Sequence, residues 1–260
     1  MPDFDNNGAT IHYELMGSGS PLLCIAGIAS DSASWAPIVP LLADRYRLIM
    51  IDNRGCGRTK AQLPLSIRDM ADDCAALLDK LGLERVDVLA HSMGGIIANR
   101  LAVQHPTRVR RLVTMTTTPR PLRKATELMN DMENLAYEIE PQRWFRLLFQ
   151  WLFSEPFFAN VDSLRTAAMA STLYAFRQSP EHFAAQHAAS QAHEPVDVSR
   201  IACPVLVLAG ERDIIIPPDA VKAQHAPIPN HRFELVPNAA HSVHWEAPEA
   251  VAKLVRDFLS

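Results

Sequence analysis

The sequence predicts an α/β fold built on a mostly parallel, doubly wound sheet, that is, a sheet with helices on both faces. Apolar runs of strand type alternate with amphipathic helical runs, at a spacing typical of successive βαβ units. The 260 residues, 48% hydrophobic and 21% charged, can bury one sizeable core. The alternation stops at Pro119 and resumes at Pro204, which predicts a helical insertion between two strands.

Short runs rich in apolar residues indicate strands. In a strand with one buried face, apolar and polar residues alternate, and in a strand with two buried faces the apolar run is continuous. The predicted strands cover residues 9–16, 21–28, 47–51, 86–91, 109–116, 204–210 and 232–236. The first of them ends at a tight turn with two glycines, so we expect it at the edge of the sheet. The continuous apolar runs that follow it are expected in the centre.

Helices are predicted between these strands, at residues 34–43, 66–81, 92–106, 219–224 and 248–259. The helix that begins at Ser66 carries apolar residues at intervals of three and four, the pattern of an amphipathic helix packed on a sheet. Gly82 ends this helix. The last helix repeats the pattern with Val251, Leu254, Val255 and Phe258.

The stretch from Val86 to Asn99 joins a strand directly to a helix at Ser92, with Ala90 and Gly94 on either side. Such a turn holds its central residue in a strained backbone conformation, and only small neighbours let the two elements pass closely. It would lift the Ser92 hydroxyl off the carboxyl edge of the sheet, at a helix N-terminus that favours negative charge. The pattern is G-x-S-x-G with its first glycine replaced by alanine. The simpler alternative is a βα turn in which Ser92 only caps the helix.

The insertion divides the chain into a predicted core domain, residues 1–118 and 199–260, and a helical lid, residues 119–198. The lid is rich in large apolar side chains and shows no strand-like alternation. These side chains are Met129, Met132, Trp144, Phe145, Phe149, Trp151, Phe153, Phe157 and Phe158. We expect most of them to form the core of the insertion itself, and we also expect the insertion to cover Ser92 and to line an apolar pocket.

A serine hydroxyl is a weak nucleophile near neutral pH and needs a base within hydrogen-bond reach, which an acid in turn orients. Asp213 falls just past the strand at 204–210, and His241 falls just past the last strand. Their positions at strand ends favour these roles over two alternatives. Asp213 could be only a turn residue, with Asp219 capping the next helix, and His244 could be the base in place of His241. The chain order Ser, Asp, His is the one found in α/β-hydrolases.

The sequence resembles the α/β-hydrolase superfamily over nearly its whole length outside the insertion. The residues from His241 to Glu249, His-Ser-Val-His-Trp-Glu-Ala-Pro-Glu, are similar to an H-x-x-x-x-E-x-P-E run common in that family. The resemblance implies a mostly parallel sheet of the α/β-hydrolase type. It also implies that Ser92 is the nucleophile, His241 the general base and Asp213 the orienting carboxylate.

The resemblance further implies an oxyanion hole made by two backbone N–H groups. One would come from Met93 and the other from the loop after the first buried strand, where we expect Ile28. Many relatives have His-Gly at the end of that strand, whereas this chain has Ala26 and Gly27. Gly27 is therefore the alternative donor.

By this resemblance, the predicted function is that of a serine hydrolase that cleaves a small carboxylic ester or lactone through an acyl-enzyme intermediate. Residues 26–35 and 239–241 resemble those of 3-oxoadipate enol-lactonases. A serine nucleophile excludes the dehalogenases and epoxide hydrolases of this fold, which need aspartate at that position. Two alternatives stay open: a carbon–carbon bond hydrolase of the same fold, and a hydrolase-like receptor that binds a small molecule with little turnover.

Composition argues against several kinds of partner. With a formal net charge of −4 and a pI near 6.2, the chain offers no basic surface to nucleic acid or to a membrane. No cofactor and no metal is predicted, because neither His241 with His244 nor the set His182, His187 and His193 has further ligands at suitable spacing.

Four cysteines without a C-x-x-C pair, and a start unlike a signal peptide, predict a cytoplasmic protein. The expected partner is a small ester or lactone, and the oligomeric state stays open, a homodimer included.

Overall fold

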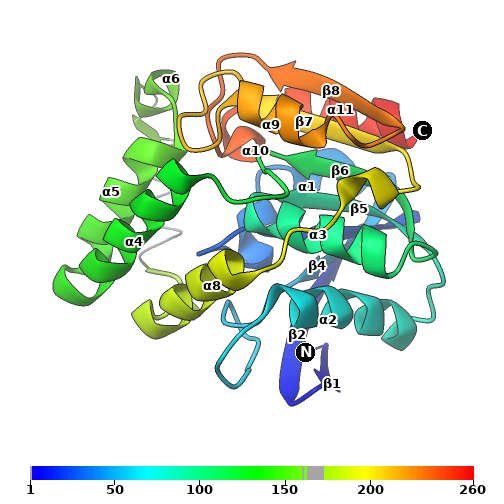
Figure 1. Cartoon of the computed structure of the whole chain (residues 1–260), viewed down its shortest axis with the longest axis horizontal. Coiled ribbons are helices and arrows are strands. Elements are labelled where there is room, and N and C mark those ends of the chain that lie inside the picture. Colours follow the sequence, from blue (N-terminus) through cyan, green and yellow to red (C-terminus); the bar gives the residue numbers. More distant parts are fainter. Residues whose placement is uncertain (1, 160, 163–172) are drawn as a thin grey trace.

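The computed structural model describes residues 2–159, 161–162 and 173–260, and Figure 1 shows their arrangement. In this part of the chain eight strands form one sheet, in the order β1-β2-β4-β3-β5-β6-β7-β8. The strands are β1 (Asp3–Asn6), β2 (Ala9–Met16), β3 (Ser20–Ile25), β4 (Tyr46–Ile51), β5 (Val86–His91), β6 (Val109–Met115), β7 (Val205–Gly210) and β8 (His231–Val236). All neighbours from β4 to β8 in this order pair in parallel, whereas β1 with β2 and β2 with β4 are antiparallel.

Helices cover both faces of this sheet and create two cores (Figure 1). They are α1 (Val39–Leu42), α2 (Ile67–Lys80), α3 (Met93–Gln104), α9 (Pro218–His225), α10 (Val243–Glu246) and α11 (Pro248–Leu259). On one face Cys74 of α2 and Ile97 of α3 pack with Val88 of β5. On the other face Leu42 of α1 and Val255 of α11 pack with strand residues. The predicted fold class is therefore confirmed.

The first predicted strand, β2, is not the edge of the sheet. β1 precedes it and pairs with it through a turn in which Asn7 and Gly8 have φ angles of +43° and +75°. Two successive residues with positive φ are typical of a type I′ hairpin turn, for which Asn-Gly is a preferred sequence. The prediction of β2 as the edge strand is wrong, and the Asn7-Gly8 pair is the local signal that indicates the additional strand.

Two other predicted elements are shorter in the structure. The helix expected at 34–43 is replaced by a 3-10 turn at Ser32–Trp35 and by the short α1. Pro37 and Pro40 explain the interruption, because proline has no N–H to donate and its ring collides with the preceding helical turn. The strand expected at 21–28 ends at Ile25, so that residues 26–28 begin a loop.

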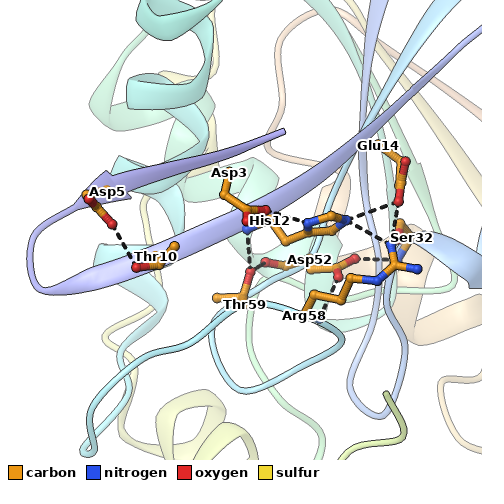
Figure 2. Close-up of polar contacts among 9 residues, drawn as sticks. All are labelled: Asp3, Asp5, Thr10, His12, Glu14, Ser32, Asp52, Arg58 and Thr59. Carbon is orange, nitrogen blue, oxygen red and sulfur yellow. Dashed lines mark hydrogen bonds and ion pairs between the residues drawn. The ribbon is translucent and has the colours of Figure 1, made fainter. Parts of the chain in front are cut away.

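A polar cluster ties the N-terminal hairpin to the loops that follow β3 and β4 (Figure 2). The Thr59 hydroxyl accepts a hydrogen bond from the His12 N–H at 2.9 Å and donates one to the Asp52 carbonyl at 2.7 Å. The Asp52 carboxylate accepts from the N–H groups of Ser32 at 2.8 Å and Arg58 at 2.9 Å. The cluster therefore fixes the loop after β3 against the loop after β4.

Between β6 and β7 the described residues form helices instead of strands. These are α4 (Arg123–Glu138), α5 (Pro141–Leu152), α6 (Glu155–Ala159) and α8 (Pro180–Ala192). Figure 1 shows α4, α5 and α6 together at one side of the molecule, with α8 packed along α4. Their aromatic side chains form a separate core that includes Trp144, Phe145, Phe149, Phe153, Phe157 and Phe183. Residues 160 and 163–172 of the predicted lid lie outside the described residues, and the division into core and lid domains stays a prediction.

All four cysteines are buried and have free thiols. Cys24 and Cys74 belong to the cores on opposite faces of the sheet. Burial raises the pKa of both thiols. These cysteines are therefore protonated at neutral pH and act as small apolar packing groups.

The ion pair between Arg54 and Asp73 joins the loop after β4 to α2 and provides a test of the fold. Arg54 Nε lies 2.6 Å from Asp73 Oδ2, and the two residues are only 5% and 1% exposed. Because Asp73→Ala leaves a buried guanidinium without its counter-charge, we expect the free energy of unfolding in urea to fall by about 3–5 kcal/mol. The control is the exposed pair of Lys253 and Asp257, in which Asp257→Ala should cost less than about 0.5 kcal/mol. Equal losses in the two variants would contradict this account.

Candidate active site

Ser92 lies at the junction of β5 and α3 with a φ of +52° and a ψ of −121°. Its N–H donates to the Met115 carbonyl at 3.0 Å, and its own carbonyl accepts from the Gly95 N–H at 2.8 Å and the Thr117 hydroxyl at 2.7 Å. These bonds hold the backbone in a region that side chains rarely adopt. The Ser92 side chain makes no capping bond to α3, which removes the alternative that it only caps the helix.

Small residues after Ser92 let α3 approach the sheet. A Cβ atom on Gly94 would lie 2.1 Å from the Ile25 carbonyl oxygen, and one on Gly95 would lie 2.4 Å from Thr117 Cγ2. Ala90, which replaces the first glycine of the motif, is fully buried within β5, between β3 and β6. The structure therefore accommodates alanine before Ser92 but requires glycine after it.

The structure brings Ser92, His241 and Asp213 into one hydrogen-bonded chain. His241 Nε2 lies 2.9 Å from Ser92 Oγ, and His241 Nδ1 lies 2.8 Å from Asp213 Oδ2. With a proton on Nδ1, the imidazole donates to the carboxylate and accepts from the serine hydroxyl. This arrangement can remove a proton from Ser92 when the hydroxyl attacks an electrophile.

The acid and the base follow neighbouring strands, β7 and β8. Asp213 Oδ1 accepts from the N–H groups of Ile215 and Ile216, both at 2.9 Å, which leaves Oδ2 directed to His241. At the end of β7, a Cβ atom on Gly210 would lie 2.0 Å from the Ala240 carbonyl oxygen. The two strand ends therefore pack closely enough to bring the carboxylate and the imidazole together.

Two further side chains hold the backbone of His241. Its carbonyl accepts from the Thr116 hydroxyl at 2.8 Å and from His91 Nε2 at 3.0 Å. Thr116 follows β6 and His91 ends β5, so four strands contribute to the position of the imidazole. Thr116 was not predicted as a site residue, although its place just after a strand is the signal that also indicates Asp213 and His241.

His244, the alternative base, is buried beside the chain of the three residues. Its ring packs against Trp35 at 5.3 Å and against His91 at 4.6 Å between centroids. Burial, and secondarily the neighbouring His241, lower the pKa of His244 to about 3. Asp219, considered as a helix cap, lies instead in the first turn of α9, whose N-cap residue is Pro217. His244 is thus part of the buried packing beside His241.

Glu246, from the run after His241, anchors the loop that carries the imidazole. Its carboxylate accepts from the Ala240 N–H at 2.7 Å and from the Ser154 N–H at 2.9 Å. Ser154 follows α5, and the Ser242 N–H donates to the Leu152 carbonyl at 3.1 Å beside it. Burial raises the pKa of Glu246 despite these bonds. The loop is thereby attached to the helices between β6 and β7.

Met93 and Ile28 are the residues whose N–H groups the sequence predicts as oxyanion donors. Within the part of the chain that the structure describes, neither group donates to another atom. Both residues line a cavity that also contains Ser92 and His241. Gly27, the alternative donor, does not line that cavity.

The cavity has a volume of about 220 Å³ and is bounded by core loops and by the helices between β6 and β7. Of the aromatic side chains predicted there, Phe145, Phe149 and Phe153 line it. Trp144 and Phe157 belong to the separate helical core without lining the cavity, whereas Phe145, Phe149 and Phe153 belong to that core and line the cavity as well. The two expectations therefore hold together for these three residues.

Neither a metal cluster nor a membrane span is found in residues 2–159, 161–162 and 173–260. No group of three or more His, Cys, Asp or Glu side chains there is arranged to hold a metal ion. His187 pairs with Glu133 at 3.0 Å, and His193 lies 3.1 Å from the Pro119 carbonyl oxygen. Within the same residues, every helix is too short or too polar to cross a membrane.

The comparison of the chain with known families agrees with this geometry. The family described as alpha/beta hydrolase fold matches residues 20–248. The chain belongs to the α/β-hydrolase family. Membership confirms the resemblance and identifies the chain as a hydrolase of the α/β fold.

Three relatives illustrate the range of this α/β-hydrolase family. "Putative carbamate hydrolase RutD" of Caulobacter sp. strain K31 is 30% identical over 256 residues, covering 90% of this chain and 88% of the relative. A thermophilic esterase from Thermogutta terrifontis superposes with a TM-score of 0.86 at 28% identity, over 96% of this chain and 93% of the other. The enol-lactonase from Burkholderia xenovorans LB400 gives a TM-score of 0.89 over 99% of both chains, but at 23% identity it shows the fold alone.

The buried neutral His244 should make the stability of the protein sensitive to acid. Its pKa is about 3 in the folded chain and about 6.5 when unfolded, so below pH 6.5 only the unfolded chain takes up the proton. Stability is lost as the pH falls toward 3, and at pH 5 this one group costs about 2 kcal/mol. We expect the loss of unfolding free energy between pH 7 and pH 5, measured in urea, to be smaller by about that amount in His244→Phe. The same loss in variant and wild type would show that His244 does not titrate in this way.

Proposed function

We propose that this α/β-hydrolase cleaves a small carboxylic ester or lactone, with Ser92 as the nucleophile, His241 as the general base and Asp213 as the orienting acid. The observation that carries the proposal is the continuous chain of hydrogen bonds from Asp213 through His241 to Ser92. Ser92 and His241 both line the cavity. A nucleophile, its base and its acid at hydrogen-bond distance are the arrangement that acyl transfer requires.

In the first half of the reaction, Ser92 Oγ bonds to the carbonyl carbon and its proton passes to His241 Nε2. Asp213 stabilises the imidazolium that forms. The tetrahedral intermediate then expels the alkoxide, which takes the proton from Nε2 and leaves as the alcohol. The acyl group stays on Ser92 as an ester.

In the second half, water attacks the acyl carbon and gives a proton to His241 Nε2. The intermediate collapses to the carboxylic acid, and the proton returns to Ser92 Oγ. With a lactone the alcohol stays attached to the acyl group, so the product is a single hydroxy acid. The same three residues therefore serve both substrate types.

We propose the Met93 and Ile28 N–H groups as the donors to the oxyanion. Met93 is the first residue of α3, where helix N–H groups have no partner within the helix. Donors fixed by the backbone stabilise the developing negative charge without having to reorganise, which lowers the barrier for both halves of the reaction. The lack of any other acceptor for these two groups supports this assignment.

The printed names of the relatives suggest the first substrates to test. An esterase, a carbamate hydrolase and an enol-lactonase all act at a carbonyl carbon that bears a leaving heteroatom. A cavity of about 220 Å³ favours a small acyl group. Aryl esters, small lactones and an aryl carbamate are therefore the appropriate panel.

The decisive measurement is release of the leaving group from this panel by wild type, Ser92→Ala and, as a matched control, the exposed Ser18→Ala. We expect sustained turnover in wild type and in Ser18→Ala. Ser92→Ala should lower kcat by a factor on the order of 10⁴ or more, because the attacking oxygen is absent.

Burst and steady-state phases must be resolved in the same experiment. A burst of one equivalent without turnover would support a small-molecule receptor instead of an enzyme. Turnover that survives in Ser92→Ala would reject the proposed nucleophile. Circular dichroism of the two serine variants controls for loss of fold.

A further inference from the structure

Asp31 is a buried carboxylic acid in the wall of the cavity that contains Ser92. It lies in the loop after β3, three residues beyond Ile28, and it caps the 3-10 turn at Ser32–Trp35. The residue is buried, with an exposed fraction of 8%. The proposed mechanism gives it no role.

Within the described residues, the hydrogen bonds of Asp31 leave part of its carboxyl group unused. Its Oδ1 accepts from the Ala33 N–H at 2.9 Å, and the Tyr174 hydroxyl donates to the same carboxyl group. A carboxylate has about four lone-pair sites for donors. The unused capacity belongs to a residue that lines the cavity.

No cation neutralises this carboxyl group within the described residues. Arg58, whose positive charge acts on Asp31, forms an ion pair with Glu14 and stacks over the Phe176 ring at 4.4 Å. Asp52, the other acid beside the loop, has N–H donors on both oxygens, as Figure 2 shows. Asp31 is therefore the acid here that has capacity for a ligand.

The position of Asp31 is energetically unfavourable for a charge in the absence of a ligand. Burial, and then the neighbouring Asp52, raise the pKa of Asp31 to about 6. A buried carboxylate without a counter-ion is stabilised by any further donor that reaches it. A ligand with such a donor would thus gain more from this wall than an apolar ligand of the same shape.

Another part of the cavity wall has different chemistry. Met129, Phe145 and Phe149, from the helices between β6 and β7, present apolar surface to it. A substrate that satisfies both walls has an apolar part and, separated from it, a hydrogen-bond donor. Such a substrate differs from a plain alkyl ester by one hydrogen-bond donor on its acyl chain.

We propose that Asp31 is a specificity residue that accepts a hydrogen bond from an ammonium or hydroxyl group of the substrate. The proposal rests on the proposed function, because it assigns a substrate class to the same cavity. It differs from a purely structural role, in which Asp31 only holds Tyr174 and the 3-10 turn. A structural residue affects all substrates alike, whereas a specificity residue affects only those that carry the donor.

The test uses three acyl chains of equal length as p-nitrophenyl esters: heptanoate, 6-hydroxyhexanoate and 6-aminohexanoate, each with its shorter homologues. We expect wild type to favour at least one donor-bearing ester over its alkyl partner by about tenfold or more in kcat/KM. Asp31→Asn, which keeps the size of the side chain and an acceptor for Ala33, should lose most of the preference for the ammonium ester. Its kcat/KM for heptanoate should stay within about threefold of wild type. Comparison of the rates for the hydroxyl-bearing and ammonium-bearing esters identifies which donor is recognised.

Two control variants accompany Asp31→Asn. Asp5→Asn removes a carboxylate from the exposed hairpin and should leave all rates unchanged. Tyr174→Phe removes the tether but keeps the ring, and the preference should persist in it. No preference in wild type at any chain length, or an equal loss for all three esters in Asp31→Asn, would overturn the proposal.

Binding to Ser92→Ala, measured by calorimetry with the same esters, separates this proposal from the proposed function. If wild type cleaves neither these esters nor any ester or lactone of the panel above, the proposed function fails. Tighter binding of the donor-bearing ester, lost on adding Asp31→Asn, would still support the role of Asp31. Equal affinities for the alkyl and donor-bearing esters would reject it.

Discussion

The candidate site depends on one close contact, the approach of α3 to the end of β3. Because Gly94 has no side chain, the first turn of α3 lies against the Ile25 carbonyl, and the chain must turn sharply at Ser92 to reach it. The positive φ of Ser92 is the result. The same contact places the start of α3 beside the loop that carries Ile28, so one packing constraint determines both the nucleophile and the proposed oxyanion donors.

The parallel sheet explains why the other residues converge on this point. The carboxyl ends of β3, β5, β6, β7 and β8 lie at one edge, and each is followed by a residue that takes part in the site. Ser92 follows its strand directly, and Asp213 and His241 come within five residues of the ends of theirs, so the pattern of strand ends indicates all three. Thr116 has the same signal, but its hydrogen bond to His241 and the tether between Asp31 and Tyr174 join segments distant in sequence and could not be predicted.

The fold was predictable to a similar extent and for the same reason. Central strands and long amphipathic helices have a strong periodic signal, and their ends differ from prediction by only a few residues. The predicted elements are wrong where the local conformation of a proline or a turn overrides the hydrophobic periodicity. Pro37 breaks a helix that composition favours, and the turn at Asn7 and Gly8 adds a strand of only four residues. A short strand buries too little to produce an apolar run.

The attachment of Glu246 to Ser154 has a consequence for how this architecture diversifies. The segment between β6 and β7 supplies the cavity wall, but it also supplies Ser154 and Leu152, which hold the loop of His241. Exchanging this segment for that of a relative would therefore alter both the specificity and the alignment of the base. A functional chimera therefore has to retain these two anchors. Any exchange of the family's variable segment has to be designed so that both hydrogen bonds to the loop of His241 are kept.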